Sequence, residues 1–114
     1  CALPILQFNQ GAYQRSQATV AAYDILERMR INRAQARVDA YEVDFGDAGV
    51  GNSIAAQDLN DWLSNLSNNL PEGEGAIACD AQNLCTVSIR WRDRFSNDES
   101  QDAPWETLSI SSQL

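Results

Sequence analysis

The chain has 114 residues, 44% of them hydrophobic, and its eight basic residues against sixteen acidic ones give a net charge of −8. This length suits a single domain with one hydrophobic core. All eight cations are arginine and there is no histidine, which excludes a histidine general base, a serine–histidine–aspartate triad and histidine-ligated zinc. The acidic balance makes nucleic acid an improbable partner, because phosphate contacts need a cationic surface.

The first predicted element is a long helix that continues to about residue 37, without glycine after Gly11. Its alanine, glutamine, arginine, leucine and glutamate residues all favour helix. Apolar residues at three- and four-residue steps form a stripe that we expect to face the core: Ala18, Ala21, Ala22, Ile25, Leu26 and Met29. A second apolar set repeats every seven residues: Leu6, Tyr13 and Val20. The helix pattern starts without a clear capping box, so we expect a helix that begins further upstream.

A glycine-rich acidic loop over residues 39–52 follows, and its length indicates a packed or functional segment. A second, shorter helix comes next, with Ser53 or Asp58 as its cap and Pro71 as its stop. Its apolar face is expected to contain Leu59, Trp62, Leu63, Leu66 and Leu70.

The remaining chain predicts three antiparallel strands, over residues 75–80, 84–92 and 105–112, with a polar loop before the third. In the second strand Val87, Ile89 and Trp91 alternate with polar residues, and in the third Leu108 and Ile110 point inward. The predicted fold is therefore α+β, one domain over residues 1–114. Residues 1–37 form the long helix, residues 38–74 the loop region with the short helix, and residues 75–114 a sheet packed on the long helix.

Two of the three cysteines, Cys79 and Cys85, flank the turn-like segment 80–83 and are expected to face each other across a hairpin. A structural disulfide there closes a seven-residue loop, worth about 2.4 kcal/mol on the chain-entropy model, and indicates an oxidising compartment. A redox or metal-binding pair is the alternative, but no CxxC spacing or third ligand supports it. Cys1 has no partner left within the chain.

Two sets of polar and charged residues can each be interpreted either as a binding site or as ordinary surface. Four arginines near the end of the long helix could bind DNA, or could balance the helix end and pair with acids, as in Asp24–Arg28. We favour the second interpretation of this set, which comprises Arg28, Arg30, Arg33 and Arg37. Four oxygen-bearing residues could hold calcium, but their spacing is not that of a calcium loop, and a solvated loop is favoured: Asp44, Asp47, Asn52 and Asp58.

The sequence predicts no catalytic, cofactor-binding or metal-ligating residue. Four carboxylates late in the chain are expected to be solvated surface, because no apolar pocket residue accompanies them: Asp93, Asp98, Glu99 and Asp102. None of the serines lies in a nucleophile-elbow motif. The expected protein is therefore not an enzyme.

Several segments resemble type IV pilins, and most closely the PilV-type minor pilins. They are residues 12–19, residues 22–30 with Asn32-Arg33, Asp61-Trp62, residues 70–75, the span from Cys79 through Trp91, and residues 108–114. The resemblance covers nearly the whole chain, and the stretch from Ala22 to Arg30 is its most specific part. Members of the family also carry a leader and a hydrophobic helical half, which this sequence does not contain.

The resemblance implies a subunit anchored in the inner membrane, with a periplasmic head, that later enters a cell-surface pilus of a Gram-negative bacterium. It also implies other minor pilins and a tip adhesin as partners, and a role in starting pilus growth. Leu6, Tyr13 and Val20 are expected to face neighbouring subunits, and Trp105 is a further candidate for a partner contact. The alternatives are a minor pseudopilin of a type II secretion system and a pilus-associated module that binds DNA or a surface ligand.

Overall fold

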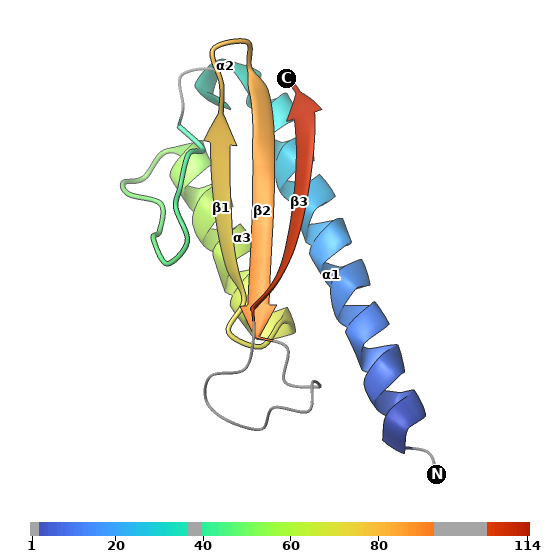
Figure 1. The fold of residues 1–114 in the computed structure, drawn as a ribbon. Coiled ribbons are helices and arrows are strands. Elements are labelled where there is room, and N and C mark those ends of the chain that lie inside the picture. The colour runs from blue at the N-terminus through green and yellow to red at the C-terminus, as the bar shows by residue number, and fades with distance from the viewer. Residues whose placement is uncertain (1–2, 37–39, 93–104) are drawn as a thin grey trace.

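The computed structural model describes residues 3–36, 40–92 and 105–114, and within the first range it describes the side chains of residues 12–34. Three helices and three strands occur in these ranges, α1 (Leu3–Ile31), α2 (Arg33–Ala36), α3 (Ile54–Asn69), β1 (Glu74–Cys79), β2 (Leu84–Arg92) and β3 (Trp105–Gln113). The strands form one layer, and α1 and α3 lie together behind it (Figure 1). The predicted α+β class is confirmed.

The sheet is an antiparallel meander in the order β1-β2-β3. Ile77 pairs with Val87, and Val87 pairs with Ile110, so these apolar residues share the face that meets the helices. The predicted strand order is correct. The strand ends differ by one residue, because β1 starts at Glu74 and ends at Cys79, while β3 continues to Gln113.

The core lies between the sheet and the two helices, and its largest side chains are the fully buried Trp62 of α3 and Trp91 of β2. The residues of α1 that were predicted to face the core are buried, apart from the partly buried Ala21. Gly75 shows how close the layers are, because a Cβ atom there would clash with the Trp62 ring. Helix α3 and strand β1 therefore pack with a ring directly against a backbone.

The long helix ends earlier than predicted. It stops at Ile31, Asn32 forms a turn, and the short α2 follows. Asparagine is a poor helix former, and the Asn32 side chain donates to the Tyr41 hydroxyl at 3.3 Å. A tertiary hydrogen bond thus competes with a continuous helix at this point. Arg37, where the prediction ended, lies outside the described residues.

The described part of the loop before α3, residues 40–53, packs on the core at its start, through Tyr41 and Val43, and is mostly exposed from residue 44 onward. Tyr41 is fully buried, and Val43 exchanges two backbone hydrogen bonds with Ile77 of β1, at 2.8 and 3.1 Å. The loop ends at Ser53, whose hydroxyl accepts from the Ala56 backbone N–H at 3.1 Å. Ser53 and not Asp58 is therefore the N-cap of α3.

The hairpin between β1 and β2 carries a disulfide that joins Cys79 to Cys85, whose Cα atoms lie 4.0 Å apart. The two residues are direct partners in the register, so the predicted pairing is confirmed. At the tip of this hairpin, the Asp80 carboxylate accepts from the backbone N–H groups of Gln82 and Leu84, each at 2.9 Å. This pattern is an aspartate-stabilised turn.

Candidate interaction surface

Helix α1 exposes large apolar side chains on the side away from the core. Tyr13 is 63% exposed, Val20 65% and Ile31 86%. Steps of seven and eleven residues each return to within about 20° of the same direction on a helix, so these three form one line, hereafter the α1 stripe. Leu6, predicted as its first member, lies in α1, but its side chain is outside the described residues.

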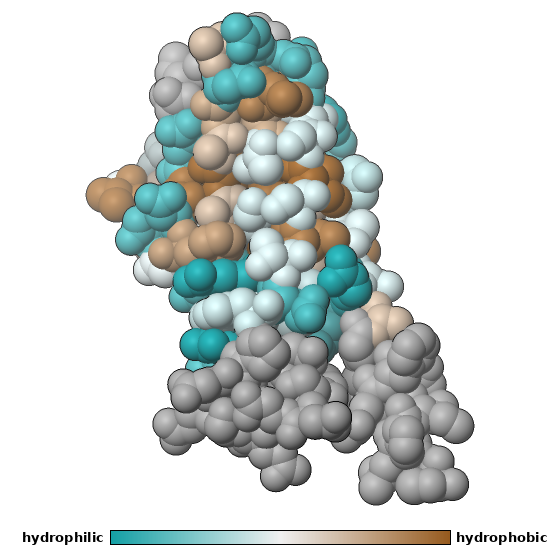
Figure 2. All heavy atoms as spheres, in the orientation of Figure 1, coloured by the Kyte–Doolittle hydropathy of each residue, from teal (hydrophilic) through white to brown (hydrophobic). Residues whose placement is uncertain are grey.

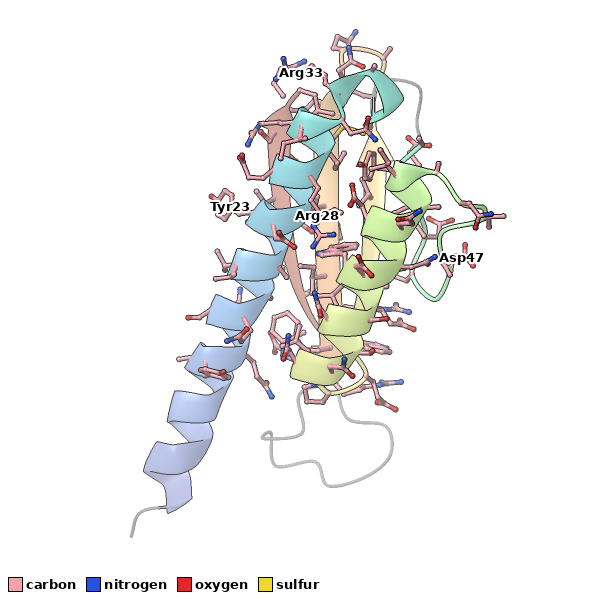
Figure 3. The ribbon with its side chains drawn as sticks, turned by 180° about the vertical axis from the view of Figure 1, so that it is seen from behind. Tyr23, Arg28, Arg33 and Asp47 are labelled. Carbon is pink, nitrogen blue, oxygen red and sulfur yellow. A yellow bond between two sulfur atoms is a disulfide. The ribbon has the colours of Figure 1, made fainter. Side chains whose placement is uncertain are left out.

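The α1 stripe is flanked by charged residues that have partners within the molecule. Asp24 pairs with Arg28 at 3.4 Å, and Glu27 pairs with Arg30 at 2.6 Å. Tyr23, 54% exposed, points away from the rest of the molecule (Figure 3). Glu27, seven residues after Val20, lies in the same direction and separates Val20 from Ile31. The exposed apolar side chains that recur along this side of α1 make it a candidate binding surface.

The arginine cluster is largely occupied by contacts within the chain. Arg28 reaches both Asp24 and Asp58 at 3.4 Å, which confirms the predicted Asp24–Arg28 pair. Arg30 contacts the Ser112 hydroxyl of β3 in addition to Glu27. Arg33 is exposed near the end of the helical segment (Figure 3), and Arg37 is not described. These contacts favour charge balance over DNA binding, because phosphates would have to displace existing partners.

A partly buried polar junction links α1, the loop and α3, and no pattern in the sequence predicted it. The Tyr41 hydroxyl donates to an Asp58 carboxylate oxygen at 2.6 Å and accepts from Asn32. Burial, followed by the hydrogen bond to Asp58, raises the pKa of Tyr41 to about 12. Asp58 therefore serves the junction between the helices, where it also meets Arg28.

The contacts of Asp58 count against the calcium site that was considered from the sequence. Asp47, one of the four candidates, lies on the loop at the outer side of the molecule (Figure 3), whereas Asp58 is held by Tyr41 and Arg28. Within the described ranges, no three histidine, cysteine, aspartate or glutamate residues are grouped so that they could hold a metal ion. The four carboxylates weighed for acid–base chemistry, Asp93, Asp98, Glu99 and Asp102, fall outside these ranges.

Trp105 lies on the solvent side of the sheet, half-buried among cations. The guanidinium carbon of Arg92 is 4.0 Å from the centre of its ring, and that of Arg90 is 4.3 Å away. Arg90 also lies 4.3 Å from the Phe45 ring and pairs with Glu74 at 2.6 Å. Arg90 thus joins the loop residue Phe45 to the sheet residue Trp105 through cation–π contacts. Because its ring already has two cationic partners, Trp105 is a weaker candidate for a partner contact than the α1 stripe.

The solvent face of the sheet between these arginines and the hairpin consists of short hydroxyl side chains. Thr86 bonds Ser111 at 2.8 Å, and Ser88 bonds Ser109 at 2.9 Å, across β2 and β3. A column of near-white residues on this face is visible in Figure 2. The two faces of the sheet therefore differ sharply. Most of the large exposed apolar side chains in the described ranges lie on α1, and the others are Val50 of the loop, Ile54 of α3 and Leu84 at the start of β2.

None of the helices within the described ranges combines the length and the apolar character that crossing a membrane requires.

Comparison with known proteins identified no relative of this chain, since no family model, no curated protein and no solved structure matches it.

Proposed function

We propose that the protein is a minor pilin subunit of a type IV pilus, which helps to start pilus assembly in a complex with other minor pilins. The α1 stripe carries this proposal. A helix that buries one side against its own sheet and exposes Tyr13, Val20 and Ile31 on another is suited to packing against sibling helices. The role is structural, and the binding event is helix association.

The architecture supports the same proposal. A long helix laid on a small antiparallel sheet, with a shorter helix in the connecting region, is compatible with a pilin-like head. The Cys79–Cys85 disulfide suits a periplasmic or extracellular location. In this proposal the head stands in the periplasm on an inner-membrane helix and then enters the pilus of a Gram-negative bacterium, with other minor pilins and a tip adhesin as partners.

The test places a charge on the α1 stripe of the full-length protein in its own bacterium. Tyr13→Glu and Val20→Glu should each reduce the number of surface pili and the recovery of minor pilins with the protein, because a buried carboxylate at a helix interface is strongly unfavourable. Ser64→Glu, at an exposed position on α3, is the control and should leave both unchanged.

Folding is checked separately by the melting temperature of the purified variants. Normal piliation in both stripe variants would contradict the proposal. A melting temperature far below that of the unmodified protein would also contradict it, because the stripe would then belong to the core. Recovery of secretion-system pseudopilins in place of pilins would transfer the proposal to a type II secretion system.

A further inference from the structure

The two edges of the sheet differ, because the chain itself closes one of them and leaves the other open. At the β1 edge, Val43 exchanges two backbone hydrogen bonds with Ile77, and the Glu42 carboxylate accepts from the Cys79 backbone N–H at 3.0 Å. Strand β3 forms the opposite edge (Figure 1). Within the described ranges, no backbone hydrogen bond reaches the outer side of β3. This side is therefore open to pairing with another strand.

The register shows which backbone groups of β3 point outward. Hydrogen-bonded and non-bonded pairs alternate along an antiparallel ladder. The Leu114 N–H donates to the Asn83 carbonyl oxygen at 3.0 Å, directly after the last strand pair. Even-numbered residues of β3 therefore bond β2. The odd-numbered residues, hereafter the β3 edge row, turn their N–H and C=O groups away from β2: Trp105, Thr107, Ser109, Ser111 and Gln113.

Another β-strand is the partner that matches the β3 edge row. The donors and acceptors of the row repeat every two residues, about 6.8 Å, and a helix cannot offer this repeat because its backbone groups bond one another. The strand is nine residues long and pairs with β2 without a bulge. It contains no proline or lysine, and its one charged residue, Glu106, faces the helices and pairs with Arg15 at 3.3 Å. The features by which edge strands usually prevent pairing are thus missing from β3.

The core is also less well covered at this edge than in the middle of the sheet. Leu108 and Ile110 of β3 face the helices but are only partly buried. Their partners on β2, Ile89 and Val87, are fully buried. The exposed Tyr23 of α1 projects beyond the outer side of β3 (Figure 3). A strand added here would place its helix-side side chains over Leu108, Ile110 and Tyr23.

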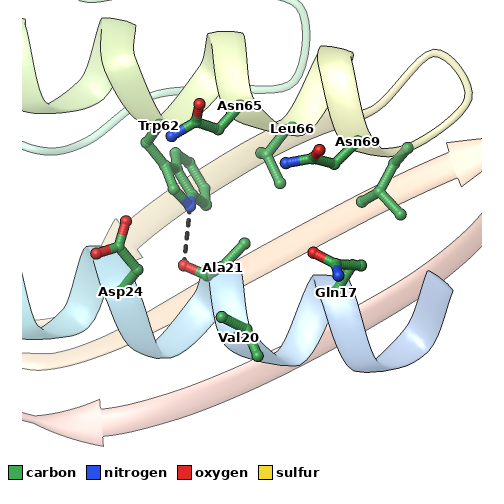
Figure 4. Close-up of a pocket in the computed structure, with 9 residues that line it drawn as sticks. Gln17, Val20, Ala21, Asp24, Trp62, Asn65, Leu66 and Asn69 are labelled. Carbon is green, nitrogen blue, oxygen red and sulfur yellow. Dashed lines mark hydrogen bonds between the residues drawn. The ribbon is translucent and has the colours of Figure 1, made fainter. Parts of the chain in front are cut away.

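Helix α1 lies directly behind β3. Two contacts join them, one near each end of the strand: Arg15 with Glu106 at 3.3 Å, and Arg30 with the Ser112 hydroxyl. On its other side α1 is attached to α3, since the Trp62 indole N–H donates to the Ala21 carbonyl oxygen at 3.0 Å (Figure 4). Helix α1 is therefore held in this position from both sides.

This position of α1 disfavours a second copy of the chain as the added strand. Two antiparallel β3 strands would lie about 4.8 Å apart, with both helix layers on the same side of the joined sheet. The two α1 helices would then be far closer than the separation of about 8–10 Å that packed helices need. The β1 edge of a second copy is already closed by Val43 and Glu42. The structure thus favours a strand that has no helix behind it.

We propose that the β3 edge row binds one extended segment of a partner protein, which adds a fourth strand to the sheet. A segment of nine residues matches the length of β3. Its apolar side chains, at alternate positions, contact Leu108, Ile110 and Tyr23 on the helix side, and small polar side chains lie between them on the solvent side. This inference goes beyond the proposed function and does not depend on it, since the α1 stripe and the β3 edge row share no residue.

A synthetic peptide tests the inference by hydrogen exchange. The probe alternates threonine and valine, has blocked ends and carries a lysine at each end for solubility. In the free protein, the backbone amides of Thr107, Ser109 and Ser111 should exchange rapidly. With the peptide at about ten times its dissociation constant, they should exchange about tenfold more slowly. Leu108 and Ile110 should be protected in both cases, because they bond β2. A control peptide with two adjacent prolines at its centre should give no protection.

Ser109→Pro tests the β3 edge row directly. This change removes an outward N–H but none of the bonds to β2, and proline is tolerated at such edge positions. The variant should bind the peptide about tenfold or more weakly, because a donor is lost and the ring blocks the approach. Ser109→Ala, the matched control, loses the hydroxyl contact with Ser88 but keeps the N–H, and should bind as tightly as the original. Tyr13→Glu, on the α1 stripe, should also leave the affinity unchanged.

The inference is overturned if the amides of the β3 edge row are already protected in the free protein, if the peptide slows none of them, or if Ser109→Pro and Ser109→Ala bind equally. Sedimentation measures the oligomeric state, and a dimer that protects these amides would overturn the choice of a partner segment in favour of a second copy. If Ser109→Pro melts far below the original, Ser111→Pro takes its place, and the exchange measurement on the unmodified protein remains decisive.

Discussion

The two long helices of the molecule, α1 and α3, lie side by side on the same sheet, yet they differ in how many of their large apolar side chains are exposed. In α3, Leu59, Trp62 and Leu66 are all buried, and Ile54, its first residue, is the large apolar side chain that it exposes. In α1, Ile25, Leu26 and Met29 are fully buried, while the α1 stripe and Tyr23 are exposed. Because both helices pack on the same sheet, the difference comes from where the apolar residues lie in their sequences.

Helix α3 has one apolar face and helix α1 has two. The apolar residues of α3 recur at the helical repeat and point in one direction. Those of α1 point partly toward the sheet and partly away from it. A helix that only completes a core needs one face, and the proposed packing against other subunits rests on the second face of α1. Substitutions in the two helices and in the contacts between them should therefore differ in their effect on stability.

Truncating the central residue of α3 should have the largest effect. Trp62→Ala removes a fully buried ring and its hydrogen bond to the Ala21 carbonyl, and should lower the free energy of unfolding by about 3–5 kcal/mol. Urea denaturation followed by circular dichroism measures this loss. A loss below about 1 kcal/mol would mean that α3 is not the structural helix described above.

Removing the disulfide should have the second largest effect, although it lies far from the contact between the helices. The double variant Cys79→Ser/Cys85→Ser should lose about 2.4 kcal/mol, since the unfolded chain regains the freedom of the closed loop. Because both cysteines belong to the hairpin of β1 and β2, the exposure of Tyr13 and Tyr23 should not change. Tyrosine fluorescence quenching checks that exposure, and a change in it would show that the hairpin supports α1.

The junction between α1 and α3 predicts a dependence on alkaline pH. The fold raises the pKa of Tyr41 from 10.0 to about 12, so its neutral form is favoured in the folded state. This contribution is complete below pH 10 and is lost as the pH rises through about 12, at up to about 1.4 kcal/mol per pH unit. The chain has no lysine, so few other groups titrate in this range.

Denaturation curves between pH 8 and pH 12 test this dependence, with Tyr41→Phe as the matched variant. The variant lacks the Tyr41 hydroxyl but keeps the ring, and the exposed Tyr13 and Tyr23 are the same in both proteins. The slope above pH 10 should therefore be smaller in the variant. Identical slopes would show that Tyr41 is not held neutral by Asp58 and its surroundings.

Truncating the α1 stripe should have the smallest effect on folding. Tyr13→Ala removes a ring of the same class as that of Trp62, but the side chain is already 63% exposed, and the free energy of unfolding should change by about 0.5 kcal/mol or less. The same denaturation assay serves for both. Equal losses at Tyr13 and Trp62 would remove the distinction between the two helices.

Local patterns in the sequence predicted most of the fold. Strict alternation in residues 84–92 predicted β2 and its buried face, and the spacing of Leu59, Trp62 and Leu66 predicted the buried face of α3. The pairing of Cys79 with Cys85 followed from a short turn between two strands. Each of these features depends on neighbours within a few residues, which is why periodicity was sufficient.

The features that were missed depend on contacts between distant segments. The end of α1 at Ile31 coincides with a hydrogen bond from Asn32 to Tyr41, and Tyr41 also needs Asp58 of α3. The contacts of Trp105 with Arg90 and Arg92 depend on the register of β2 and β3. The periodicity of residues within one segment does not indicate which distant segment it will contact.

The backbone bridge between Val43 and Ile77 has a consequence for how the sheet can grow. An edge strand with unpaired backbone amide and carbonyl groups can pair with a strand of another molecule, which is one origin of aggregation. At the midpoint of β1, the amide and carbonyl groups of Ile77 are already taken by the loop. An incoming strand would first have to displace Val43, so the loop protects this edge of the sheet from further pairing. Val43→Pro removes one of the two backbone hydrogen bonds, and we expect this variant to form fibrils more readily than the unmodified protein.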